Sequence, residues 1–169
     1  MITTPKLEDR QAQHYVGIRT QVPMQELPVV IPQFIGEVIG WLGQQGVQPA
    51  GAPFIRYHVI NMTAKLDIEV GWPVASALTG SGRIAAGVLP AGRYAALIYT
   101  GDYPGLMEAN AALLDWGAKQ GLVWDSWESA NGDGFGARYE SYLTNPNDEP
   151  DLSKHETEVA IRLADNQRH

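Results

Sequence analysis

The sequence predicts an α+β fold in which a strand–helix–strand–strand unit occurs twice. The predicted elements follow this order two times along the chain, and two short segments of the first unit recur in the second. The 18 Gly and 11 Pro residues among 169 are typical of many turns between short strands. We therefore expect one domain over residues 12–164, with repeats at 12–78 and 84–164, a flexible tail at 1–11 and another tail at 165–169.

The first unit begins with a weakly alternating strand at 14–22 and a loop that contains three prolines. Pro32 then starts a helix at 33–45, whose apolar residues recur at three- and four-residue spacing. Strands at 53–61 and 65–74 follow. The second of them alternates apolar and polar residues, which indicates a hairpin partner with one buried face.

The second unit repeats this order after an extended apolar segment at 84–90. A strand at 93–100 leads to a helix at 104–119, and the segment 123–136 is expected as a long loop. The last two strands, 139–144 and 157–163, form a second hairpin joined by a Pro- and Asp-rich loop.

Two sequence matches support the duplication. The triplet Arg-Tyr-His at 56–58 lies 82 residues before Arg-Tyr-Glu at 138–140, and Glu69-Val70 lies 89 residues before Glu158-Val159. Repeats of this size usually form two like units packed about a pseudo-twofold axis. Ligand sites commonly form where such units meet.

The composition excludes several classes of function. Lys and Arg number 12 against 19 Asp and Glu, a net charge of −7, which disfavours nucleic acid as a partner. The absence of Cys excludes disulfides, thiolate metal sites and cysteine nucleophiles. The four His show no metal-ligand spacing and no phosphate-binding glycine loop is present, so we expect neither a metal nor a cofactor. Because no apolar run is long enough to cross a membrane and no signal peptide is recognisable, we expect a cytoplasmic protein.

Glu140 is the first candidate for a functional residue. Along its strand it shares a face with Arg138 and Tyr142, and Tyr139 lies on the other face. If the helices cover the Tyr139 face, Glu140 and Tyr142 point to the opposite side of the sheet. A carboxylate beside aromatic rings can bind a cation or act as a general acid or base. The alternative is a solvent-facing strand residue, which is the commoner position for a charged side chain.

His58 occupies the corresponding place in the first unit, so a pseudo-twofold axis places it opposite Glu140 across a cleft. A histidine at the surface or at the edge of the core is the alternative. Aromatic residues at strand ends, turns and the long loop can line the same cleft, and Glu158 is a pocket-lining or solvent-exposed residue. These further candidates are Tyr57, Trp72, Tyr99, Tyr103, Trp127 and Glu158.

Several segments resemble the GyrI-like small-molecule-binding domain family when taken together and in order. They cover about residues 12–164 and include GAPFIRYH from 51, LDIEVGWPV from 66, GVLPAGRYA from 87, YTGDYPGL from 99, LLDWGAKQGL from 113, YESYLTNP from 139 and TEV from 157. The resemblance implies a curved antiparallel sheet with helices on one face and a central ligand cleft. It also implies that Glu140 lies in the cleft among aromatic residues and that Tyr142 follows it. The family often has an aromatic residue in the last strand where this chain has Ala160, which implies a more open wall.

The resemblance implies three functions for a stand-alone member of this family. The first is binding of hydrophobic, aromatic or cationic drug-like molecules, as in the effector-binding halves of transcription regulators. The second is hydrolysis of cyclopropane-bearing, DNA-alkylating natural products, with Glu140 as acid or base and Tyr57, His58 or Tyr142 assisting. The third is a protein-binding module like the gyrase-inhibiting relatives, with a protein partner in place of a small ligand. The oligomeric state is not predicted.

Overall fold

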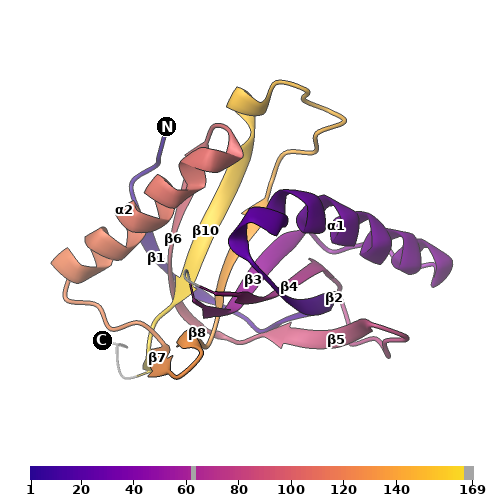
Figure 1. Ribbon diagram of the computed structural model, residues 1–169, viewed down its shortest axis with the longest axis horizontal. Helices are drawn as coiled ribbons and strands as arrows, with labels where there is room; N and C mark the ends of the chain where they lie inside the picture. The colour runs from indigo at the N-terminus through magenta and orange to yellow at the C-terminus, as the bar shows by residue number, and fades with distance from the viewer. Residues whose placement is uncertain (62–63, 166–169) are drawn as a thin grey trace.

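The protein folds around one bent antiparallel sheet with two helices (Figure 1). The structure is a computed structural model and describes residues 1–61 and 64–165. Among these residues the sheet has ten strands. Eight of them follow the order β1-β6-β10-β9-β3-β4-β2-β5, while β7 and β8 form a hairpin attached to β3. The predicted α+β fold is confirmed.

The first half of the chain builds one half of the sheet. Its elements are β2 (Gln13–Val22), a short 3-10 helix (Met24–Glu26), α1 (Leu27–Gln44), β3 (Phe54–Ile60), β4 (Leu66–Pro73) and β5 (Ile84–Leu89). Strand β4 pairs with both β2 and β3, and β5 adds to the free edge of β2.

The second half of the chain repeats this arrangement at the other end of the sheet, so that β6, β9 and β10 correspond to β2, β3 and β4. Its elements are β6 (Gly92–Thr100), a 3-10 helix (Tyr103–Gly105), α2 (Leu106–Lys119), β7 (Ser126–Ser129), β8 (Gly132–Phe135), β9 (Arg138–Tyr142), a 3-10 helix (Leu152–Lys154) and β10 (Glu156–Arg162). Strand β10 pairs with β6 and β9, and β1 (Lys6–Arg10) adds to the free edge of β6. The two halves join where β3 pairs with β9.

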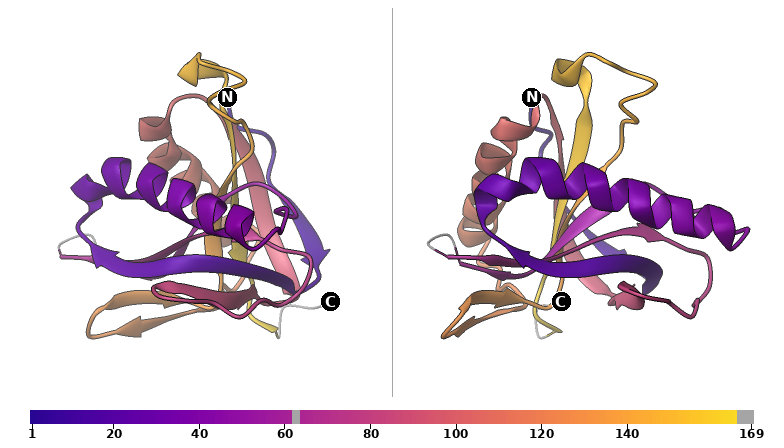
Figure 2. Two further views of the ribbon diagram at one scale, coloured as in Figure 1. Left: turned by 90° about the vertical axis from the view of Figure 1, so that its right-hand side faces the viewer. Right: turned by 45° about the vertical axis from the view of Figure 1, so that its right-hand side comes forward.

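Each helix covers its own half of the sheet. Helix α1 packs on β2 and β4, and α2 packs on β6 and β10 (Figure 1). Figure 2 shows that the sheet bends between the two halves, so that the strands under α1 run in a different direction from those under α2. The central strands β3 and β9 therefore lie between the two helices rather than beneath either one.

A second core lies on the face of the sheet away from the helices; we call it the aromatic core because Tyr15, Phe54, Tyr94 and Tyr139 belong to it. Tyr15 contacts Phe54 edge to face at 5.1 Å between ring centroids, and Phe54 contacts Tyr139 in the same way at 5.9 Å. Ala160 belongs to this core. It therefore does not form a wall beside Glu140, because that carboxylate lies on the helix side.

Three segments differ from the sequence-based prediction. Helix α1 begins at Leu27, six residues before the predicted start, because buried Leu27 and partly buried Ile31 continue the apolar period of Phe34 and Val38. Pro32 consequently lies inside the helix, on its exposed side.

Residues 6–10, predicted as part of a flexible tail, form β1 instead. This pairing uses backbone groups at an edge of the sheet, so it leaves little trace in the side-chain pattern. The predicted loop 123–136 contains the β7–β8 hairpin, whose first strand is fully exposed and has no apolar alternation. Of the second predicted tail, 165–169, only Asp165 belongs to the described residues. In the described part of the chain, neither helix combines the length and apolar character required to cross a membrane.

Candidate ligand-binding site

Glu140 lies in the middle of the sheet, with Ile55 of β3 on one side and Val159 of β10 on the other. Ile55 belongs to the core under α1 and Val159 to the core under α2. Glu140 therefore points to the helix side of the sheet, where its side chain is buried. The condition considered from the sequence, that the helices cover the Tyr139 face, is not met, because Tyr139 belongs to the aromatic core on the other side.

Two hydrogen bonds hold the Glu140 carboxylate. The Tyr57 hydroxyl donates to Oε1 at 3.2 Å, and Asn110 Nδ2 donates to Oε2 at 2.8 Å. Asn110 Nδ2 also donates to the Leu106 carbonyl oxygen, while Asn110 Oδ1 accepts from Arg138 Nη2 at 3.0 Å. Because every polar atom of this amide has a partner, its orientation is determined and α2 is tied to β9. We call Tyr57, Asn110, Arg138, Glu140 and Tyr142 the Glu140 cluster.

The electrostatics of the cluster are dominated by burial. Burial raises the pKa of Glu140 above its ordinary value, and the hydrogen bonds from Asn110 and Tyr57 and the charge of Arg138 only partly oppose it. Burial also lowers the pKa of the Arg138 guanidinium. The pKa values of Tyr57 and Tyr142 are raised, first by burial and then by the nearby Glu140 carboxylate, so both phenols stay protonated donors.

An aromatic side chain extends the cluster toward solvent. The Tyr103 ring contacts the Tyr142 ring edge to face, with centroids 6.0 Å apart, and is 40% exposed. His155 is buried, and its Nε2 lies 2.6 Å from the carbonyl oxygen of Glu149. Because a carbonyl only accepts, Nε2 carries a proton, and Nδ1 lies within hydrogen-bond distance of the Tyr103 hydroxyl, at 3.0 Å. Tyr103 thus forms a fixed aromatic rim above Tyr142.

His58 does not join this cluster. Its Nε2 lies 2.9 Å from Glu69 Oε1, which also accepts from the Tyr15 hydroxyl at 2.5 Å. Tyr15 belongs to the aromatic core on the face opposite the helices, so His58 and Glu140 lie on opposite faces of the sheet. The expectation that the two residues face each other is therefore wrong. Burial alone favours a higher pKa for Glu69, but the hydrogen bonds from His58 and Tyr15, together with the charges of His58 and Arg56, outweigh burial and lower the pKa.

Of the remaining candidates, Trp72 and Tyr99 lie on the same face of the sheet as Glu140, and Glu158 lies on the opposite face. Trp72 donates from Nε1 to the Ile35 carbonyl oxygen and packs against the core under α1. Tyr99 is buried under α2, where its hydroxyl donates to the Asp102 carbonyl oxygen. Trp127 is half exposed on β7 and pairs with Gly134 of β8. Glu158 forms an ion pair with Arg10 at 3.0 Å, on the side of the aromatic core.

Three residues in and around the cluster were missed as site residues: Asn110, Arg138 and His155. The strand pattern places Arg138 on the same face as Glu140 but gives it no role. Asn110 lies between Leu106, Ala109 and Leu113 in the apolar period of α2, and a polar residue at such a position is a usable signal. Nothing in the sequence around His155 distinguishes it before the fold is known. Among the described residues, no group of three or more His, Asp or Glu side chains is arranged to hold a metal ion.

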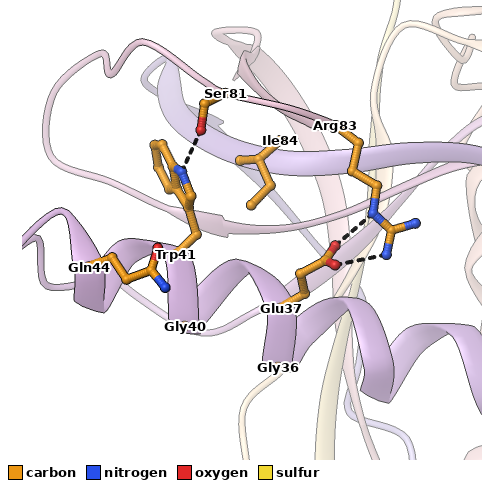
Figure 3. Close-up of a pocket in the computed structure, with 8 residues that line it drawn as sticks. All are labelled: Gly36, Glu37, Gly40, Trp41, Gln44, Ser81, Arg83 and Ile84. Atoms are coloured by element: carbon orange, nitrogen blue, oxygen red, sulfur yellow. Dashed lines mark hydrogen bonds and ion pairs between the residues drawn. The ribbon is translucent and has the colours of Figure 1, made fainter.

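A groove lies at the outer edge of the sheet, between α1 and the start of β5, with a volume of about 360 Å³ (Figure 3). Four of the residues that line it are paired with each other through polar groups. Trp41 Nε1 donates to Ser81 Oγ at 2.8 Å, and Arg83 forms a two-pronged ion pair with Glu37. Because the groove lies at the edge of the sheet and Glu140 lies on central strand β9, the groove is separate from the Glu140 cluster.

Comparison with known families identifies the chain. A family model described as the GyrI-like small molecule binding domain matches residues 3–164. The chain belongs to the GyrI-like family. The resemblance seen in the sequence is therefore confirmed. A search of curated proteins gave no match.

Solved structures share the GyrI-like fold. The C-terminal domain of EcmrR is 21% identical with a TM-score of 0.74, and the match covers 95% of this chain and 97% of that domain. Against EcmrR in its DNA complex the TM-score is 0.72 at 20% identity, and this chain, matched over 95% of its length, spans 57% of the EcmrR chain. The structure of SAV2435 bound to tetraphenylphosphonium gives 0.65 at 11% identity, with 99% and 98% coverage. A hydrolase from Listeria innocua gives 0.59 at 10% identity, with 95% and 91% coverage.

Proposed function

We propose that this GyrI-like domain binds hydrophobic, aromatic or cationic small molecules at the Glu140 cluster, between α1 and α2. The observation that carries the proposal is a buried carboxylate, Glu140, held at the centre of the sheet by Tyr57 and Asn110. Glu140 forms no ion pair among the residues that the structure describes, and a buried acid without one is costly for stability, so its presence at this position favours a role in binding.

The surroundings of Glu140 suit a flat organic ligand. Tyr57 and Tyr142 are densely surrounded, which raises their pKa values, yet both keep part of their surface accessible. Both rings therefore present part of their surface to an incoming ligand. Aromatic rings with polar edges offer both apolar contact and hydrogen bonds. SAV2435, which has the same fold, binds the aromatic cation tetraphenylphosphonium, and this supports the same class of ligand here.

The proposal is tested with a panel of aromatic dyes and lipophilic cations by isothermal titration calorimetry. We expect micromolar binding of several members to the wild type and at least about tenfold weaker binding of cationic members to Glu140→Gln, which removes the charge at nearly constant volume. Glu69→Gln is the matched control, because it removes a buried carboxylate from the other face. Failure of the whole panel to bind the folded wild type overturns the proposal.

A second candidate is hydrolysis of cyclopropane-bearing natural products. The raised pKa of Glu140 favours this candidate, because a carboxyl group that keeps its proton nearer neutral pH can act as a general acid. Tyr57 is within hydrogen-bond distance to assist, whereas His58 is on the other face. Incubation with a cyclopropanoid, followed by mass spectrometry, distinguishes the candidates: turnover lost in Glu140→Gln supports hydrolysis, and product formed at the uncatalysed rate excludes it.

A further inference from the structure

Arg138 is the second charged group of the Glu140 cluster. It lies two residues before Glu140 on β9 and on the same face of the sheet. Its guanidinium contacts neutral groups, with Nη2 donating to Asn110 Oδ1 at 3.0 Å and the Phe135 ring centroid 4.8 Å from Cζ. In the described part of the chain, its Nε is buried without a hydrogen-bond partner. The cation therefore depends on Glu140, one amide group away, as its nearby buried negative charge.

The sum of the two charges constrains the ligand. With Glu140 ionised the pair is neutral, and with Glu140 protonated the pair carries a charge of +1. The cluster is therefore net negative in neither state. Asp133, the other carboxylate that acts on Arg138, is exposed on β8, so solvent screens its charge. A permanent cation that pairs with Glu140 is repelled by Arg138 across a poorly screened distance and also removes the counter-charge of the guanidinium.

Resting on the proposed function, we propose that Arg138 sets the charge selectivity of this site and directs it toward net-neutral aromatic ligands. Such a ligand places a hydrogen-bond donor near Glu140 and an acceptor near Arg138. Asn110, which contacts both charged residues through opposite ends of its amide, holds the two groups at a fixed separation. Arg138 is thus a specificity-determining residue, and the neutral members of the ligand class are the ones that the wild type favours.

The test compares two probes of similar aromatic shape and different charge by calorimetry. They are tetraphenylphosphonium, a permanent cation, and triphenylphosphine oxide, a neutral molecule with one strong acceptor. The measured quantity is the ratio of their dissociation constants, which cancels general effects on stability. We expect Arg138→Gln to shift the ratio toward the cation by about tenfold or more, equivalent to about 1.4 kcal/mol. Arg138→Lys, which keeps the charge, leaves the ratio within about threefold of wild type.

Arg19→Gln is the matched control, because it removes the same charge from an exposed residue that pairs with Asp67. We expect this variant to leave the ratio unchanged. Thermal melting establishes that each variant is folded, and Arg138→Met replaces Arg138→Gln if the latter unfolds. Binding of both probes with the same ratio in the wild type and in the folded charge-removing variant overturns the inference and leaves the proposed function intact. If neither probe binds to any variant and no member of the dye panel binds to the folded wild type, the proposed function is overturned, and this inference with it.

Discussion

Asn110 of α2 donates a 2.8 Å hydrogen bond to Oε2 of Glu140, at the centre of the sheet. The same nitrogen donates to the Leu106 carbonyl oxygen one helical turn earlier, so the amide is anchored within its own helix. The position of α2 and the orientation of the buried carboxylate are consequently coupled.

Asn110→Ala tests this coupling through stability. The variant leaves a buried carboxylate oxygen without its donor, and we expect the free energy of unfolding to fall by about 1.5–3 kcal/mol in urea denaturation. Asp115→Ala on the same helix removes only an exposed ion pair with Lys119, and its expected effect is below about 0.5 kcal/mol. Equal stabilities of the two variants would contradict the coupling.

The pH dependence of stability tests the burial of Glu140. Its pKa in the folded protein is raised above 4.5, first by burial, so the folded state holds the proton more tightly than the unfolded chain. The stabilising contribution of the protonated form is present below pH 4.5 and is lost as pH rises through the folded pKa. We expect the free energy of unfolding of the wild type to fall relative to that of Glu140→Gln as the pH rises from 4.5 through the folded pKa of Glu140. Denaturation at a series of pH values from 4 to about 8 measures this difference. A difference that is independent of pH would show that Glu140 titrates as an exposed acid.

Two variants of Tyr103 distinguish the contribution of its ring to ligand binding from the contribution of its hydroxyl to stability. Tyr103→Phe keeps the ring against Tyr142 but removes the hydrogen bond to His155, so we expect unchanged ligand affinity and a stability loss of about 1 kcal/mol. Tyr103→Ala removes the ring as well, and affinity for an aromatic ligand should fall about two- to tenfold. Loss of affinity in the Phe variant as large as in the Ala variant would rule out the ring as the contact.

His58 provides a prediction of no effect on binding. Because its imidazole contacts Glu69 on the face opposite the helices, His58→Gln should change ligand affinity by less than about twofold. The stability of the variant should fall, since Glu69 loses its hydrogen bond to the imidazole and keeps the one from Tyr15. If calorimetry finds a tenfold loss of affinity in this variant, the ligand binds on the face opposite the helices, and the assignment of the site to the Glu140 cluster is contradicted.

Much of the fold follows from apolar periodicity, and the exceptions have physical causes. Helix α2 and strand β4, which bury a continuous apolar face, are predicted within two residues of their observed bounds, whereas α1 begins six residues before its predicted start. Strand β1 and the β7–β8 hairpin depend on backbone pairing at sheet edges, where the side-chain pattern carries little information.

The site, like the fold, follows from the side-chain pattern only in part. The strand pattern singles out Glu140 as an acid near aromatic residues, and its side chain is buried, but its face and its partners do not follow from that pattern. The matched triplets suggest that His58 corresponds to Glu140, whereas the observed register sets Ile55 opposite Glu140 and Arg56 opposite Tyr139. A shift of one residue along a strand moves a side chain to the other face, so short sequence matches cannot decide the partner of a strand residue.

The most direct measurement follows the side-chain carboxyl carbons of the glutamates by carbon-13 NMR while a ligand that binds is added. We predict that the Glu140 resonance titrates at higher pH than the Glu69 resonance and shifts on saturation with the ligand. The Glu69 resonance on the opposite face should not move. A saturated ligand that leaves the Glu140 resonance unchanged would contradict the assignment of the binding site to this cluster.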